Sequence, residues 1–122
     1  MEVQVLRQYC LQKPGVEETF PFGPEGAVFK VMGKMFAILS VQPAEGENTR
    51  ITLKCDPIQA QLLRQTYPAV QPGYHMNKRH WNTITCDGTI PEDENYEMID
   101  NSYDLVVAML TRKDRERLER ES

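Results

Sequence analysis

The chain has 122 residues, 40% of them apolar and 26% charged, and a formal charge of −4. These values are typical of a folded globular protein and argue against a disordered chain. No apolar run approaches the ~20 residues of a membrane-spanning helix, and the first residues resemble no secretory signal, so we expect a cytoplasmic protein. We expect one domain, residues 1–122, with residues 112–122 as a charged C-terminal helix or tail.

The charges are distributed unevenly along the chain. Residues 1–26 carry a formal charge of −2, residues 27–86 carry +4, and residues 87–122 carry −6. Such asymmetry is compatible with a local basic face on a protein that is acidic overall. The sign of the total charge therefore does not exclude a polyanionic partner.

The three cysteines, Cys10, Cys55 and Cys86, are far apart in the sequence and form no Cys-x-x-Cys pair. An odd number at this spacing is not typical of a disulfide framework or a zinc site, so we expect reduced thiols in the core. The alternative is a thiol nucleophile paired with His75 or His80.

The first half of the chain predicts one helix followed by strands. Apolar residues recur at helical spacing over residues 3–12, and Pro21 favours an edge strand or extended loop at residues 17–22. The β-rich runs 27–32 and 35–41, joined by Gly33 and Lys34, predict a hairpin. Residues 49–55 alternate strictly, which predicts a strand with one buried face and one solvated face. Its two sets are Ile51, Leu53 and Cys55 on the buried side, and Arg50, Thr52 and Lys54 on the solvated side.

The second half predicts a strand between helices. Asp56, with Pro57 and Gln59 after it, is a typical helix start. We expect this second helix to end at Pro68 and to bury an apolar stripe that consists of Ile58, Leu62 and Leu63. A strand at residues 81–86 and a long helix from about Pro91 follow, and Thr111 is expected to cap the last helix. The predicted fold class is α+β: a single antiparallel sheet with helices packed on one face.

Residues 72–83 contain both histidines, the only tryptophan, two adjacent cations and two asparagines. Alternation predicts that Asn82 shares the core side with Ile84, while Trp81 lies on the solvated side with Lys54. An exposed indole among cations is suited to stacking a nucleic-acid base while the cations contact phosphates, and an asparagine is suited to reading a base edge. The candidate nucleic-acid-binding residues are Lys54, His75, Asn77, Lys78, Arg79, His80, Trp81 and Asn82.

Several other interpretations of the same residues remain open. In a purely structural interpretation, Trp81 covers the sheet, the histidines form hydrogen bonds with the loop backbone, and Asn77 adopts a left-handed turn. Histidines five residues apart do not match helical metal ligation. No glycine-rich phosphate loop and no recognisable catalytic signature is present. We therefore expect no enzyme activity, no metal and no cofactor.

Four segments, taken in order, resemble the MmcQ/YjbR family, and the similarity extends over nearly the whole chain. They are Lys13–Glu18, Val31–Ala37, His75–Thr83 and Asn101–Val106. The resemblance implies a fold like that of the bacterial frataxin homologues of the CyaY type, and a DNA-binding role with a double-wing arrangement. We therefore predict a small cytosolic protein that binds DNA or another nucleic acid. The alternative is a protein-interaction or small-ligand-binding module that uses the same surface.

Overall fold

The computed structural model describes residues 2–73 and 76–121, which form four helices and six strands. The helices are α1 (Val3–Leu11), α2 (Pro57–Thr66), α3 (Glu92–Ala108) and α4 (Arg112–Glu121). The strands are β1 (Val16–Thr19), β2 (Gly26–Val31), β3 (Lys34–Ser40), β4 (Arg50–Lys54), β5 (Val70–Pro72) and β6 (Trp81–Thr85). The elements predicted from the sequence are present, and the short β5 is an addition to them.

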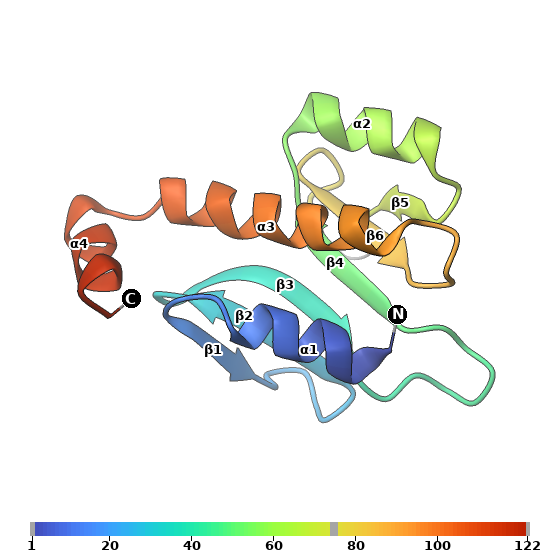
Figure 1. Cartoon of the computed structure of the whole chain (residues 1–122), viewed down its shortest axis with the longest axis horizontal. Coiled ribbons are helices and arrows are strands. Elements are labelled where there is room, and N and C mark those ends of the chain that lie inside the picture. Colours follow the sequence, from blue (N-terminus) through green and yellow to red (C-terminus); the bar gives the residue numbers. More distant parts are fainter. Residues whose placement is uncertain (1, 74–75, 122) are drawn as a thin grey trace.

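All six strands belong to one antiparallel sheet with the order β1-β2-β3-β4-β6-β5 (Figure 1). The predicted α+β class with a single antiparallel sheet is therefore confirmed. The likeness to frataxin homologues stays a prediction. Consecutive strands pair as hairpins from β1 to β4, whereas β5 comes before β6 in the chain and lies at the far edge.

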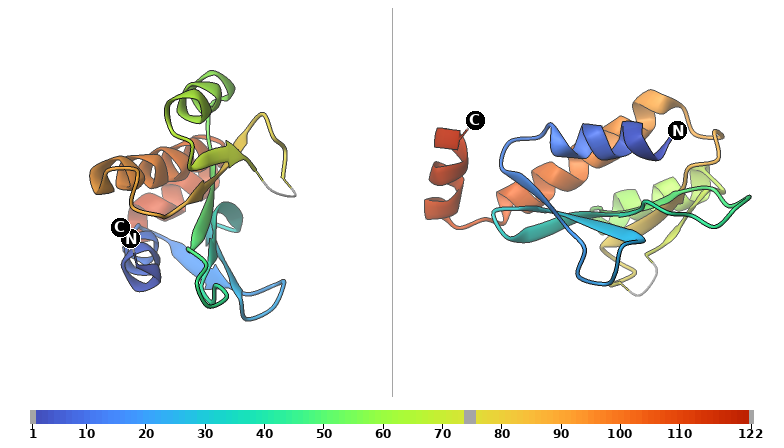
Figure 2. Two further views of the ribbon diagram at one scale, coloured as in Figure 1. Left: turned by 90° about the vertical axis from the view of Figure 1, so that its right-hand side faces the viewer. Right: turned by 90° about the horizontal axis from the view of Figure 1, so that it is seen from below.

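Helices α1 and α3 cover one face of the sheet, called here the inner face (Figure 2). Helix α3 crosses β2, β3 and β4, and its buried side chains meet the inward side chains of these strands in one apolar core. The largest fully buried apolar residues of this core are Phe29, Phe36, Leu6, Leu39, Ile51, Ile84 and Ile99. The opposite, outer face carries neither α1 nor α3.

The predicted β2–β3 hairpin is confirmed, but its turn differs by one residue from the prediction. Val31 pairs with Lys34, so the two linking residues are Met32 and Gly33, with φ of 50° and 81°. A two-residue turn with positive φ at both positions matches the right-handed twist of the strands. Glycine adopts this backbone without strain, and Met32 is the only non-glycine residue in the described chain with positive φ.

The sheet forks where β3 and β4 separate. Their pairing runs from Leu39 with Ile51 to Ala37 with Leu53, and there it ends. Beyond it, the hydroxyl of Ser102 in α3 accepts from the backbone N–H of Lys54 at 2.8 Å and donates to the carbonyl of Phe36 at 2.6 Å. A helix side chain thus replaces the next rung of the ladder, which leaves the end of β4 free to diverge toward α2.

Helix α2 begins as predicted but buries almost nothing. The Asp56 carboxylate accepts from the N–H groups of residues 58 and 59, as an N-cap should. The predicted apolar stripe is wrong, because Ile58 is 73% exposed, Leu62 is 51% exposed and Leu63 is half-buried. Ala60 is the buried residue of this helix. The Ala60 carbonyl accepts from the Asn82 Nδ2 of β6, so this side of the helix faces the sheet, and the side that carries Ile58 and Leu62 points to solvent.

Helix α4 is attached to the body by one apolar side chain. The Thr111 hydroxyl accepts from the N–H of Asp114, which confirms the predicted cap. Leu118 is 6% exposed and belongs to the core, although every other residue of α4 is exposed or half-buried. It packs on Gly15, where an added Cβ would lie 2.4 Å from the Leu118 Cδ1 atom. The final charged segment is therefore a docked helix.

Candidate nucleic-acid interface

The outer face of the sheet carries more positive than negative charge. Strand alternation, with the pairing register, directs Lys30, Arg50 and Lys54 outward, and Glu17 is the outward anion opposite Lys30. The acidic first turn of α3 lies over the inner face. The acidic start of α3 and the outward cations Lys30, Arg50 and Lys54 therefore lie on opposite sides of the sheet.

Trp81 lies on the outer side, as alternation predicts, but its expected exposure is wrong because only 8% of the residue is accessible. The Lys54 Nζ atom lies 5.8 Å from the centre of the indole ring. The backbone of Gly73 crosses the other end of the residue, and a Cβ added there would lie 2.7 Å from the Trp81 Cβ. The indole is thus covered by its neighbours and presents little surface for stacking on a base.

Asn82 points toward the core, as predicted, and is 2% exposed. Its Oδ1 accepts from the Arg64 Nε at 2.7 Å, and its Nδ2 donates to the Ala60 carbonyl at 3.3 Å. Both ends of the amide are therefore engaged inside the protein. The residue joins β6 to α2, and this arrangement does not present its amide to a base edge.

Arg64 was missed in the sequence analysis, although it is the only charged residue of α2. Besides its bond to Asn82, its guanidinium donates from Nη2 to the Trp81 carbonyl at 3.3 Å and to the Lys78 carbonyl. One side chain thereby fixes the end of the turn and the start of β6. A lone cation in an otherwise uncharged helix is the signal that points to such a role.

The turn before β6 presents Asn77, Lys78 and Arg79 to solvent, and His80 is half-buried. The Asn77 Oδ1 accepts from the Arg79 N–H at 3.0 Å, which closes a side-chain turn. Asn77 does not hold a left-handed backbone, because its φ is not positive. The His80 carbonyl accepts from the Cys55 N–H at 2.8 Å, so the turn lies beside the end of β4. His75 lies outside the described residues.

A shallow pocket of about 260 Å³ is present on the outer face. Its lining residues are Gly26, Ile38, Ser40, Arg50, Thr52 and Thr83. Thr52 was expected to be solvated but is 8% exposed, and its hydroxyl lies 2.9 Å from that of Thr83 on the neighbouring strand. Arg50 is exposed at the edge of this pocket. The outer face is therefore partly covered and hollowed, with Arg50 beside a threonine-lined floor.

The three cysteines are free, and Cys10 and Cys86 are buried as expected. Burial raises the pKa of Cys10 to about 12 and that of Cys86 to about 11. Cys55 is half-buried, and burial followed by the charge of Asp56 raises its pKa as well. All three are thiols at neutral pH, the form that is weak as a nucleophile. Within residues 2–73 and 76–121, no three His, Cys, Asp or Glu side chains are grouped closely enough to hold a metal ion.

The fold and this surface define a small α+β protein, with helices on one face of an antiparallel sheet and cationic side chains on the other. The family model YjbR matches residues 11–105. The chain belongs to the YjbR family. In the part of the chain that the structure covers, no helix has the length and apolar composition needed to cross a bilayer.

Curated relatives and solved structures agree with this assignment. The chain is 38% identical to the uncharacterised protein YbdF of Escherichia coli O157:H7, over 94% of this chain and 92% of the relative. It is 36% identical to YjbR of Escherichia coli K12, over 97% and 98%. A Deinococcus radiodurans protein of known crystal structure superposes with a TM-score of 0.86 at 40% identity, covering 97% of this chain and 88% of the other. A Pseudomonas syringae protein superposes with a TM-score of 0.75 at 31% identity, covering 86% and 98%.

Proposed function

We propose that the protein binds nucleic acid through a basic surface made of Arg50, Lys54, Lys78 and Arg79. The observation that carries this proposal is the separation of charge across the sheet, with outward cations on one face and the acidic helix α3 on the other. A polyanion that approaches the outer face contacts these cations, while the sheet separates it from the carboxylates of α3.

The chemistry of this surface favours phosphate contacts over base recognition. Lys78 and Arg79 are exposed, whereas the two groups best suited to contact bases, the indole of Trp81 and the amide of Asn82, are buried. Contacts to phosphates position a nucleic acid but carry no sequence information. We therefore expect weak, salt-sensitive binding with little dependence on sequence.

Fluorescence anisotropy with labelled single-stranded and double-stranded oligonucleotides, over a series of salt concentrations, tests the proposal. Four cations on phosphates predict that log K falls with log salt at a slope of about −3 to −4 on duplex DNA. Replacing Lys78 and Arg79 together by glutamine should make the slope shallower by about 2 and weaken binding for every sequence tested.

The matched control removes two cations from α4, by the changes Lys113→Gln and Arg115→Gln. These residues are exposed on a helix outside the basic surface, so the net charge changes equally while the surface does not. An equal effect of both double variants would show that only net charge matters. Absence of binding at low salt, or binding without a negative salt slope, would refute the proposal.

A protein partner is the second candidate, and the β1–β2 loop favours it. Phe22 is 80% exposed and Phe20 is 43% exposed in this loop, and Phe20 lines a pocket with Gln4 and Arg7 of α1. Exposed aromatic side chains are enriched at protein interfaces. If the wild type binds no oligonucleotide even at low salt, this second candidate is the one to pursue. If it does bind, Phe22→Ser should leave the oligonucleotide affinity unchanged, because Phe22 is not part of the basic surface.

A further inference from the structure

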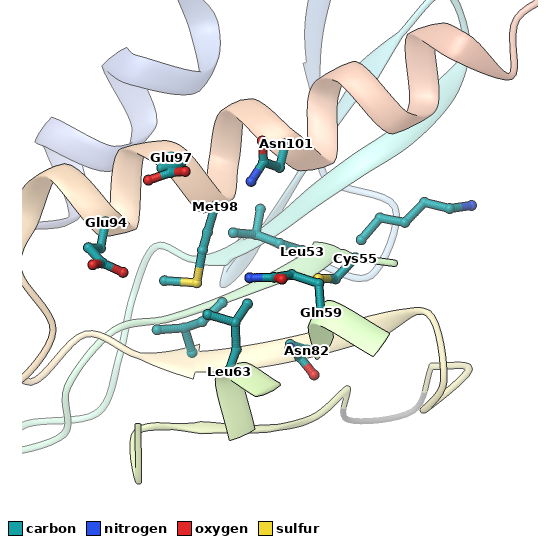
Figure 3. Close-up of a pocket in the computed structure, with 11 residues that line it drawn as sticks. Leu53, Cys55, Gln59, Leu63, Asn82, Glu94, Glu97, Met98 and Asn101 are labelled. Carbon is teal, nitrogen blue, oxygen red and sulfur yellow. The ribbon is translucent and has the colours of Figure 1, made fainter. Parts of the chain in front are cut away.

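A cleft with a cavity of about 70 Å³ lies between α2 and α3, on the inner side of the sheet and thus opposite the basic surface. Figure 3 shows Glu94, Glu97 and Met98 of α3 across from Leu63 of α2, with Leu53 of β4 between the two helices. The cleft begins at the fork of the sheet, where the end of β4 turns away from β3.

The floor of the cleft is the edge of the apolar core. Leu53 is 2% exposed, Ile84 is 1% exposed and Met98 is 8% exposed, and all three line the cavity. Helix α2 would close this edge if its apolar stripe faced inward, but Ile58 and Leu62 point to solvent. Leu63 is therefore the apolar side chain that α2 contributes to the wall, and a gap remains.

The end of the cleft nearest the start of α3 is negatively charged. Glu94 and Glu97 line it, three residues apart on one side of the helix, and within residues 2–73 and 76–121 no ion pair involves either. The pKa of Tyr67 reflects the same negative charge. It is raised by a hydrogen bond to Glu94, by burial and by the nearby carboxylates.

The nearby cations do not neutralise these carboxylates. Lys54 is the one cation among the lining residues, and its Nζ lies over the Trp81 ring on the outer side of the sheet. Arg64 is hydrogen-bonded to Asn82 and to the turn before β6. The cleft thus combines an apolar floor with uncompensated negative charge at its rim, a combination suited to a ligand with an apolar body and a cationic head.

We propose that this cleft binds a short primary alkylammonium ion. The alkyl chain lies against Leu53, Ile84 and Met98, and the ammonium group donates to the carboxylates of Glu94 and Glu97. An ammonium group has three N–H donors, so one ligand satisfies both carboxylates. The site takes a cation on the inner side of the sheet, whereas the basic surface is proposed to take an anion on the outer side. Glu94 and Glu97 do not belong to the basic surface, so changing them tests the cleft alone.

Cys55 supplies a reporter inside the cleft. Its thiol lines the cavity and is half-buried, whereas Cys10 and Cys86 are buried in the core. A thiol reagent such as iodoacetamide should therefore alkylate Cys55 first, and a ligand in the cleft should slow that reaction. Mass spectrometry of the digested protein assigns the modified cysteine.

The experiment compares n-butylammonium, n-butanol and n-butyrate, which share a four-carbon chain and differ in charge, at fixed pH and ionic strength. We expect n-butylammonium to slow the alkylation of Cys55 saturably, with half-protection at about 1–10 mM, as befits a ligand of five heavy atoms. Protection by the alcohol and by the carboxylate should be at least about tenfold weaker. The methyl NMR signal of Met98 should shift with the same concentration dependence.

The double variant Glu94→Gln and Glu97→Gln should weaken protection by n-butylammonium about tenfold and leave the effect of n-butanol unchanged. The matched control, Glu119→Gln with Glu121→Gln, removes two carboxylates from α4, outside the cleft, and should bind like the wild type. The proposal is overturned by equal protection from all three compounds, by no protection at 50 mM, or by equal effects of the two double variants. None of these outcomes alters the oligonucleotide titration, so failure at one site is distinguishable from failure at the other.

Discussion

Replacing Ser102 by alanine is expected to lower the free energy of unfolding by about 2–4 kcal/mol. The hydroxyl is 0% exposed and joins the Lys54 N–H, at 2.8 Å, to the Phe36 carbonyl, at 2.6 Å. Alanine leaves both backbone groups without this partner, and an unsatisfied buried group costs about 1–3 kcal/mol. Phe36 is fully buried whereas Lys54 is half-buried, so the Phe36 carbonyl should contribute more than the Lys54 N–H.

Urea unfolding followed by circular dichroism measures this loss. With a slope of about 2 kcal/mol per molar urea, the midpoint should fall by about 1–2 M. The control is Thr66→Ala, which removes an exposed hydroxyl that donates to the Leu62 carbonyl and should change stability by less than about 0.5 kcal/mol. If Ser102→Ala and Thr66→Ala have equal midpoints, the hydroxyl of Ser102 does not hold the fork together.

Three further outcomes are expected. Gly15→Ala should lower the free energy of unfolding by about 1–3 kcal/mol more than Gly88→Ala does, because both glycines have positive φ but only Gly15 contacts α4. The thermal midpoints of the two variants measure this difference, and equal losses would show that α4 is not docked at Gly15. Ile58→Gln should change stability by less than about 0.5 kcal/mol because the side chain is exposed, and a loss of 2 kcal/mol would contradict this placement of α2. Stability should fall as pH rises above about 9, because unfolded thiols ionise there while folded Cys10 and Cys86 retain their protons up to a pKa of about 12 and 11. The Cys10→Ala, Cys86→Ala variant should show a shallower fall between pH 9 and 11, whatever its absolute stability, and an unchanged slope would exclude the thiols as the cause.

Local signals in the sequence predicted much of the fold. The cap at Asp56 depends on bonds to its next neighbours, and the sides taken by Ile51 and Asn82 depend only on strand alternation. These rules act within a few residues, so the sequence carries them directly. The turn was predicted at Gly33 and Lys34 but lies at Met32 and Gly33, because a hairpin pattern in the sequence is compatible with neighbouring registers.

The candidate site depended on contacts between distant segments, and there the predictions were less accurate. Alternation assigns Trp81 to the outer side but says nothing of Lys54 and Gly73, which cover it. The spacing of Ile58 and its neighbours is that of a buried helix face, yet α2 reaches the sheet through Ala60. The bond between Ser102 and Phe36 joins residues 66 apart, and no local pattern indicates it.

The placement of α2 at the edge of the sheet also has a dynamic consequence. A helix that buries one side chain has little packing to lose, and its amides should exchange with solvent well before those of α3. Arg64 of this helix holds the turn that carries Lys78, and Leu63 forms a wall of the inner cleft. Local unfolding of α2 would therefore free the turn before β6 on one side of the sheet and remove a wall of the cleft on the other side. The same opening of α2 should thus affect both faces of the sheet.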